Sequence, residues 1–210
     1  GIGSTKSNEV KIEGEKSSNV HFAIDFLTGI QKRNLGNKNA QYINVEDKKV
    51  VVIGGGDTAM DCVRTSVREG ATSVKCLYRR DEANMPGSKK EVVNAKEEGV
   101  EFVFNVSPKS IKVENDLAVG VELLETSMSK SDTSGRQKVV LIEGSEYLEE
   151  ADVIILALGF SPEVPAFLKE LNVETNSWDG IVVDSNFKTT NKKVYAGGDC
   201  QRGAHLAVTA

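Results

Sequence analysis

The sequence is poor in the residues that build metal centres and disulfide frameworks. Its 210 residues include only three cysteines and two histidines, and the cysteines are far apart, with no C-x-x-C pair. Three widely spaced thiols cannot form a disulfide framework or ligate a four-thiolate iron–sulfur cluster within one chain. Two imidazoles add little toward a metal site. We therefore expect no metal, and the unpaired cysteines point to a reducing, cytoplasmic setting.

Long apolar runs and an excess of positive charge are also missing. No run of about 18 or more apolar residues occurs, so we expect no membrane-spanning helix. The first residues carry no apolar segment typical of a signal peptide. The formal net charge is −5, whereas general nucleic-acid-binding domains are usually basic. With 39% hydrophobic and 27% charged residues, the composition predicts a globular domain that binds neither membrane nor nucleic acid.

A strand, a helix and a second strand follow one another over residues 49–78. Residues 49–53 (KVVVI) form a short β-branched run, typical of a buried parallel strand. Residues 57–69 place apolar side chains on one helical face, and Gly70 is the kind of residue that commonly ends a helix. Residues 73–78 predict the next strand. The pattern is that of a βαβ unit of about thirty residues.

Outside this unit the pattern is more varied. Before it, residues 22–27 indicate one or two helical turns and residues 29–39 a polar connection. After it, consecutive strands with short connections indicate an antiparallel meander, in which residues 127–135 form an exposed hairpin loop. The further expected elements are a helix at 88–98, strands at 100–106, 109–114, 117–125, 138–143 and 152–158, a helix at 163–170, and strands at 180–184 and 193–196.

The turn between the first strand and its helix carries a G-x-G-x-x-A motif (GGGDTA). The first glycine permits a tight turn, the third lets the backbone approach a pyrophosphate, and the alanine lets the helix pack on the sheet. The first N–H groups of the helix would face the phosphates, and we expect the Asp57 side chain to act as the N-cap. A turn without a ligand is the alternative, although three adjacent glycines lose much entropy on folding. The predicted pyrophosphate contacts are Gly54, Gly55, Gly56, Asp57, Thr58 and Ala59.

The second strand ends in two arginines. An acidic residue about 20 positions after the glycines would bind the ribose 2′-hydroxyl of NAD, but Arg79 and Arg80 follow Tyr78 instead. Two guanidiniums suit a 2′-phosphate because each donates hydrogen bonds in a fork, which favours NADPH. Alternatively, the arginines could pair with Asp81 and Glu82 on a solvated loop. Tyr78 could stack on the adenine or belong to the core.

Several stretches together resemble a known family. Residues 51–62 (VVIGGGDTAMDC) and 76–88 (CLYRRDEANMPGS) resemble the small (beta) subunits of NADPH-dependent glutamate synthase. The same architecture is shared by the reductase portion of dihydropyrimidine dehydrogenase and by ferredoxin:NADP⁺ oxidoreductase subunits. The family's segment before the NADPH domain is similar to residues 23–28. Its crossover to the FAD domain is similar to residues 157–160, and its C-terminal FAD motif to residues 194–199. The resemblance covers nearly the whole chain.

The resemblance implies an α/β fold of the two-dinucleotide-binding-domain flavoprotein type. A Rossmann-like NADPH-binding domain with an antiparallel β-meander is inserted in a FAD-binding domain. It divides the chain into a linker with a partial FAD-domain segment (1–46), the NADPH-binding domain (47–158) and a partial C-terminal FAD-domain segment (159–210). The family's first glycine fingerprint and its cysteine-rich cluster region have no counterpart here. Because a helix predicted from Ala204 also reaches the last residue, we expect a piece of a longer protein with an incomplete FAD site.

The resemblance also implies a function. The domain would pass hydride from NADPH to FAD, and electrons would reach a large subunit that makes glutamate from glutamine and 2-oxoglutarate. Residues 84–88 favour glutamate synthase over a pyrimidine reductase or a ferredoxin reductase. The cofactors carry the chemistry, so we predict no catalytic residue. A non-catalytic nucleotide-binding or docking module is the alternative. By resemblance, Gly159 and Phe160 lie near the nicotinamide, and Gly198 and Asp199 contact FAD.

Two local features depart from the related domains, and the role of a third has two interpretations. Thioredoxin-reductase-type domains place a third arginine where Asn84 stands, and Lys89 or Lys90 would have to replace it. His205 stands where the family would have a smaller or acidic residue, and we interpret it as a surface side chain. The loop at 85–87 either shapes access to the nicotinamide site or is an ordinary turn.

Overall fold

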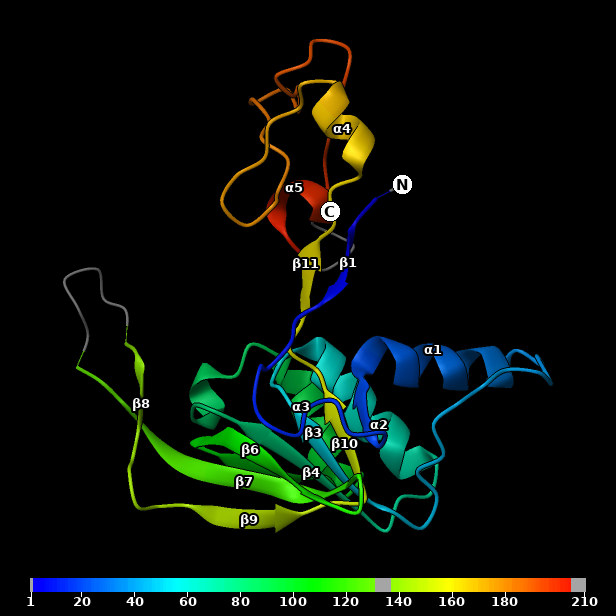
Figure 1. Ribbon diagram of the computed structural model, residues 1–210, viewed down its shortest axis with the longest axis vertical. Helices are drawn as coiled ribbons and strands as arrows, with labels where there is room; N and C mark the ends of the chain where they lie inside the picture. Colours follow the sequence, from blue (N-terminus) through cyan, green and yellow to red (C-terminus); the bar gives the residue numbers. More distant parts are fainter. Residues whose placement is uncertain (1, 131–136, 205–210) are drawn as a thin grey trace. The chain divides into compact units, whose positions relative to one another are not determined.

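The computed structural model describes residues 2–130 and 137–204, which form two compact units. The first unit is Glu9–Leu158, and the second combines the two ends of the chain, Gly1–Asn8 and Gly159–Ala210. The predicted α/β fold is confirmed (Figure 1). His205, most of the helix expected after Ala204 and the end of the polar loop before Gly135 lie outside the described residues.

A five-stranded parallel sheet forms the centre of the first unit, with the strand order β2-β10-β3-β4-β5. The middle strand is the predicted β-branched run, in which every residue after Lys49 is buried. Such burial on both faces is expected of a parallel sheet covered on each side. The strands are β2 (Val20–Phe22), β3 (Lys49–Ile53), β4 (Ser73–Tyr78), β5 (Glu101–Phe104) and β10 (Val153–Leu156).

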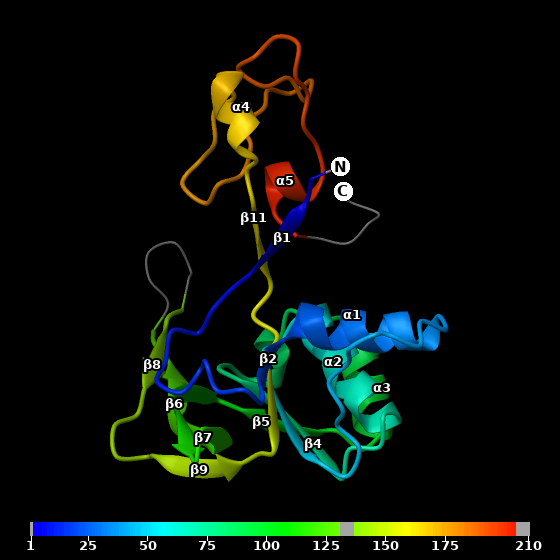
Figure 2. The ribbon, with the colours of Figure 1, turned by 45° about the vertical axis from the view of Figure 1, so that its right-hand side comes forward.

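The two faces of this sheet are covered differently. Helices α1 (Ala23–Asn34), α2 (Asp57–Arg68) and α3 (Lys89–Glu97) lie on one face, and an antiparallel sheet lies on the other (Figure 2). Successive side chains of a strand point to opposite faces. Val50 and Val52 therefore pack with the helices, whereas the alternate residues of β3 pack with the antiparallel sheet.

The antiparallel sheet is the predicted meander, centred on its longest strand. That strand, β7, pairs with β6 and also with both β8 and β9. The fourth strand was not predicted, because its short sequence ends in two glutamates and offers little β propensity. Residues 127 and 128, expected in the loop, belong to β7. The strands are β6 (Val106–Glu114), β7 (Leu117–Met128), β8 (Val139–Leu141) and β9 (Tyr147–Glu150).

The first helix corrects the sequence prediction. It runs to Asn34, through the residues expected to form a polar connection. Gly29 lies inside it and is buried, and a Cβ there would lie only 2.8 Å from the carbonyl oxygen of Gln41. A glycine that looks like a helix breaker thus permits close packing. Phe26 and Ile30 of this helix are buried in the helix-side core, so residues 9–46 lie in the same compact unit as residues 47–158.

The second unit is small and largely irregular. Strand β1 (Ser4–Ser7) pairs antiparallel with β11 (Phe160–Pro162), and two short helices follow, α4 (Ala166–Glu170) and α5 (Asp199–Arg202). The strands predicted at 180–184 and 193–196 are wrong, since each segment forms only one isolated bridge. A strand needs a continuous extended partner, which neither segment has within the described part of the unit.

None of the helices in the described part of the chain combines the length and apolar character needed to cross a membrane.

Candidate dinucleotide-binding site

The glycine turn leaves β3 at the carboxyl edge of the parallel sheet. Gly54 has φ +153°, a conformation that a side chain would strain, and a Cβ there would overlap the carbonyl oxygen of Ala157. Its N–H donates to the carbonyl of Leu77 at 3.1 Å. The turn is thereby fixed between the ends of β10 and β4, the strands that flank β3.

The next two glycines face different surroundings. Gly55 is buried, and a Cβ there would overlap the ring of Tyr78. At Gly56 an added Cβ would meet no described atom within 4 Å beyond its chain neighbours. Ala59, one helical turn further on, is fully buried in the helix-side core. The turn is therefore packed on one side and open on the other, where a ligand could reach the backbone.

Helix α2 begins differently from the prediction. Gly56 is the N-cap, and its carbonyl accepts from the N–H groups of Ala59 at 2.9 Å and Met60 at 3.2 Å. The prediction of Asp57 as N-cap is wrong, because this residue is already the first of the helix. The N–H groups of Asp57 and Thr58 have no preceding helical carbonyl to bind and lie at the positive end of the helix dipole.

A second loop lies at the same edge of the sheet, between β4 and α3. It contains a single 3₁₀ turn, η1 (Glu82–Asn84), which Asp81 caps by accepting from the Asn84 N–H at 2.9 Å. The Tyr78 hydroxyl donates to the carbonyl of Asn84 at 2.9 Å while its ring lies against Gly55. Tyr78 thus braces the loop against the glycine turn. Asn84, in the place of a third arginine, is engaged within the loop.

The loop continues across the packed side of the glycine turn. The N–H of Gly87 donates to the carbonyl of Gly55 at 2.9 Å, and the N–H of Ser88 donates to Oδ1 of Asp57 at 2.7 Å. Ser88 is the N-cap of α3. The N-termini of two helices, α2 and α3, therefore meet beside the turn. Lys89 and Lys90, in the first turn of α3, are exposed.

Among the described residues, the two arginines are held through their backbone carbonyls and not through their side chains. The carbonyl of Arg79 accepts from Oγ1 of Thr126 at 2.9 Å, and the carbonyl of Arg80 accepts from the N–H of Asn105 at 3.1 Å. The Arg79 side chain is exposed and that of Arg80 is half-buried. Burial raises the pKa of the Tyr78 hydroxyl, and the nearby Arg80 and Arg79 guanidiniums oppose this shift.

The alternative pairing of these arginines is not found among the described residues. Asp81 caps the 3₁₀ turn, and Glu82 pairs with Lys96 at 2.6 Å. Nε of Arg80 is buried and has no hydrogen-bond partner there. A buried donor without an acceptor is costly, so the Arg80 side chain suits an anionic group supplied from outside the chain.

The other predicted residues lie in the second unit. The carbonyl of Gly159 accepts from the Asn8 N–H at 3.1 Å, and Phe160 begins β11. Gly198 has φ +71° and is the N-cap of α5, which Asp199 begins. The structure therefore gathers the glycine turn and the arginines in one unit, and these four residues in the other.

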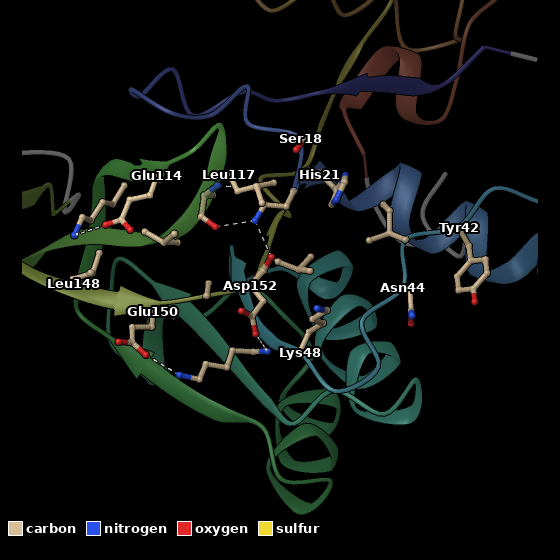
Figure 3. A pocket seen from close by; sticks show the side chains of 18 residues that line it. Ser18, His21, Tyr42, Asn44, Lys48, Glu114, Leu117, Leu148, Glu150 and Asp152 are labelled. Atoms are coloured by element: carbon tan, nitrogen blue, oxygen red, sulfur yellow. Dashed lines mark hydrogen bonds and ion pairs between the residues drawn. The ribbon is translucent and has the colours of Figure 1, made fainter.

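A cavity of about 790 Å³ lies elsewhere in the first unit (Figure 3). It is found at the amino ends of β2, β3 and β10, whereas open α/β sheets bind ligands at the carboxyl ends. Some of its polar groups already have partners: the Asn19 amide donates to the carbonyls of Ala118 and Asp152 at 2.8 Å each, and Lys49 pairs with Glu150 at 2.7 Å. None of the predicted site residues lines it.

All three cysteines are free and buried. Cys76 donates its thiol to the carbonyl of Gly54 at 3.4 Å, and burial raises the pKa of the Cys76 thiol to about 12. Burial also raises the pKa of Cys62. These thiols therefore act as apolar packing groups. Within the described residues no cluster of three or more His, Cys, Asp or Glu side chains could hold a metal ion.

Some residues of this site were not predicted from the sequence. Thr126 in β7 and Asn105 between β5 and β6 support the loop that carries the arginines. Gly87 and Ser88, just before α3, support the glycine turn. Thr126 and Asn105 lie in segments that match no motif, whereas Gly87 and Ser88 end the segment 76–88 that carries the family resemblance. No local signal could have identified these contacts, because the partners are distant in the sequence: the Thr126–Arg79 contact spans 47 positions and the Ser88–Asp57 contact spans 31.

The chain resembles known proteins over its whole length. It is 45% identical over 218 residues to the glutamate synthase [NADPH] small chain of Escherichia coli K12, covering 100% of this chain and 46% of that protein. It is 36% identical over 205 residues to the NADPH-Fe(3+) oxidoreductase subunit beta of Geobacter sulfurreducens, covering 96% and 29%. The chain thus spans less than half the length of these relatives.

A solved structure shares the fold. FprA of Mycobacterium tuberculosis in complex with NADPH matches with a TM-score of 0.77 at 16% identity, covering 99% of this chain and 58% of that one. The profile of one family, described as pyridine nucleotide-disulphide oxidoreductase, matches residues 1–210. With the glycine turn at the carboxyl edge of a parallel sheet, these matches show that the chain belongs to the pyridine nucleotide-disulphide oxidoreductase family.

Proposed function

We propose that this chain is the NADPH-binding module of a flavoprotein oxidoreductase, and that the protein containing it is a glutamate synthase small subunit. One observation carries the first part: the glycine turn is open at Gly56, at the N-terminus of α2, and two arginines without an ion pair among the described residues follow the next strand of the sheet. A diphosphate and a 2′-phosphate need these two kinds of group.

The residues present fit NADPH. The diphosphate would lie over Gly56 and accept hydrogen bonds from the N–H groups of Asp57 and Thr58. The 2′-phosphate would lie at Arg79 and Arg80, where the buried Nε of Arg80 would gain an acceptor. The packed roles of Gly54, Gly55 and Ala59 keep the turn in the shape that this arrangement requires.

FAD enters the proposal through the second unit. We infer that Gly198 and Asp199, at the start of α5, belong to a FAD site, and that Gly159 and Phe160 lie near the nicotinamide. When bound, the two cofactors supply the hydride-transfer chemistry. The residues of this chain bind and orient them, and none is proposed as an acid or base. The packed glycine turn and the arginines fix the nucleotide at its phosphates, which leaves its nicotinamide end to be directed toward the flavin.

The electron acceptor is proposed from the relatives. The similarity to glutamate synthase small chains, together with the NMPGS run of residues 84–88, supports a large-subunit partner that makes glutamate from glutamine and 2-oxoglutarate. The Geobacter relative, whose name gives Fe(3+) as its acceptor, shows that similar modules occur in proteins named for other acceptors. An acceptor assay is therefore needed as well as a binding assay.

Nucleotide binding is tested by titrating the chain with NADPH and with NADH in a calorimeter. Replacing Arg79 and Arg80 together by alanine should cost about 2–4 kcal/mol of NADPH affinity, from two charge-assisted contacts, and should leave NADH affinity nearly unchanged. Arg68→Ala is the matched control, since Arg68 lies at the far end of α2 and pairs with Glu98. Equal losses for both nucleotides, or NADPH binding no tighter than NADH in the unaltered chain, would contradict the proposal.

The acceptor is tested with the longer protein that contains this chain. Mixed with a glutamate synthase large subunit, it should oxidise NADPH only when both glutamine and 2-oxoglutarate are present, as followed by absorbance. Oxidation that requires ferredoxin or Fe(3+) instead would assign a different acceptor. A protein that binds NADPH but reduces no flavin would indicate a non-catalytic docking module.

A further inference from the structure

The carboxylate of Asp57 stands in an unexpected place. It lies in the first turn of α2, directly after the glycine turn that we propose binds a diphosphate. The helix dipole favours a negative charge at this position, but a carboxylate beside two phosphates repels them. A residue whose charge opposes the ligand needs another role in the site. Its contacts in the structure suggest one.

Asp57 connects the glycine turn to the start of α3. Its Oδ1 accepts from the N–H of Ser88 at 2.7 Å, and one residue earlier the N–H of Gly87 donates to the carbonyl of Gly55 at 2.9 Å. These two hydrogen bonds fasten residues 87–88 to both sides of Gly56. Gly87 is buried, and a Cβ there would lie 3.1 Å from the Gly55 oxygen. The segment is thus packed directly on the backbone of the turn.

These two hydrogen bonds fix the orientation of the turn's backbone toward its open side. On one side of Gly56, residues 87–88 bind the carbonyl of Gly55 and the side chain of Asp57. On the other side, a Cβ at Gly56 would meet no described atom within 4 Å. Without the Asp57–Ser88 bond, residues 87–88 would be fastened to the turn only through the carbonyl of Gly55, and the peptide between Gly55 and Gly56 could rotate, because glycine restrains its neighbours weakly. The N–H groups would then no longer converge on one ligand position.

We propose that the Asp57 carboxylate is a positioning residue that acts through Ser88 to hold the glycine turn in its ligand-receiving orientation. This inference rests on the proposed function, since the ligand is the dinucleotide diphosphate. The diphosphate is common to NADPH and NADH, so loss of the bond weakens both nucleotides equally. Loss of the arginine pair should instead weaken NADPH far more than NADH, because only NADPH carries the 2′-phosphate.

Three variants test the inference by calorimetric titration with NADPH and NADH. Asp57→Ala should weaken both about tenfold, the usual effect of losing one hydrogen bond to a charged group. Asp57→Asn keeps an acceptor oxygen and should restore both affinities to within about twofold of the unaltered chain. Asp61→Ala removes the same group one turn further along α2, where it has no contact with Ser88 among the described residues, and should change affinity less than about twofold.

Amide hydrogen exchange at Ser88, measured without nucleotide, tests the bond itself. Exchange should be slow in the unaltered chain and in Asp57→Asn, and faster in Asp57→Ala, because opening of the bond exposes the amide. This measurement is independent of the proposed function. If neither nucleotide binds the unaltered chain, the proposed function fails, and this inference fails with it even where the exchange pattern is as expected.

Three results would overturn the inference while leaving NADPH binding intact. Unaltered exchange in Asp57→Ala would show that the bond does not hold the loop. Equal weakening by Asp57→Ala and Asp57→Asn would assign the effect to charge and not to the hydrogen bond. Faster exchange in Asp57→Ala with undiminished affinity for both nucleotides would show a purely structural contact.

Discussion

Replacing Gly56 by alanine should separate nucleotide binding from folding. Gly56 has φ −90° and ψ −178°, a conformation open to any residue, and an added Cβ would meet no described atom within 4 Å beyond its chain neighbours. The unliganded fold should therefore keep its stability to within about 1 kcal/mol, because the reduced freedom of the unfolded chain offsets the weaker N-cap that alanine provides. The methyl group would occupy the open side of the turn. Crowding a close contact costs about 1–3 kcal/mol, so NADPH affinity should fall about 5-fold to 150-fold.

Titration calorimetry with NADPH and thermal unfolding without it measure the two effects separately. Gly54→Ala is the matched comparison, two residues earlier in the same turn. Its Cβ would overlap the carbonyl of Ala157, and its φ of +153° is strained for alanine. We expect it to lower the unfolding free energy by about 1–3 kcal/mol or more. If Gly56→Ala leaves NADPH affinity unchanged, the diphosphate does not lie over the open side of the turn, and the reasoning is refuted.

Three further predictions concern the surroundings of the site. Cys62 and Cys76 are buried, and burial raises the pKa of both thiols. Both should resist iodoacetamide at pH 8 in the native chain and react after denaturation, as measured by mass spectrometry. Rapid labelling of the native chain would contradict their burial. Hydrogen bonds from Arg64 hold the pKa of Glu98 below its ordinary 4.5, so this pair stabilises the fold above that pH and the gain is lost as pH falls through the lowered pKa. Arg64→Ala should therefore lower the unfolding free energy at pH 7 more than at pH 3, as urea titrations would show; equal effects would count against the pair. Burial and neighbouring carboxylates raise the pKa of Asp61 above its ordinary 3.8, so the stability of the fold falls as pH rises through the raised pKa. Asp61→Asn should therefore raise the melting temperature at pH 7 but not below pH 3.8. A lower melting temperature of Asp61→Asn at pH 7 would contradict this.

Local sequence patterns were sufficient for the central part of the fold. The β-branched run of β3, the one-sided apolar pattern of α2 and the strand that became β4 were each predicted within a residue or two. Each is a short-range pattern that one strand or one helix satisfies by itself. The glycine turn was predictable for the same reason, since its position between strand and helix follows from residues 49–69 alone.

The paired arginines were predicted as neighbours of the turn from position alone. Parallel strands β3 and β4 end at the same edge of the sheet, so residues that follow each of them are brought together by the βαβ topology. The sequence could not decide whether Arg79 and Arg80 pair with Asp81 and Glu82. Only the structure shows that those carboxylates have other partners among the described residues, a 3₁₀ cap and Lys96.

Where a residue's role depends on a distant partner, only the tertiary structure decided it. Asp57 looked like an N-cap because its type favours caps, but the partner that it binds, Ser88, lies 31 positions away. Gly29 was predicted to begin a polar connection, but it lies inside α1, and the close approach of the segment at Gln41 makes it a packing residue. Residues 180–184 had strand-like composition and no continuous partner in the described chain. Propensity is a property of a segment, whereas hydrogen-bond partners and close packing are set by the arrangement of the whole unit.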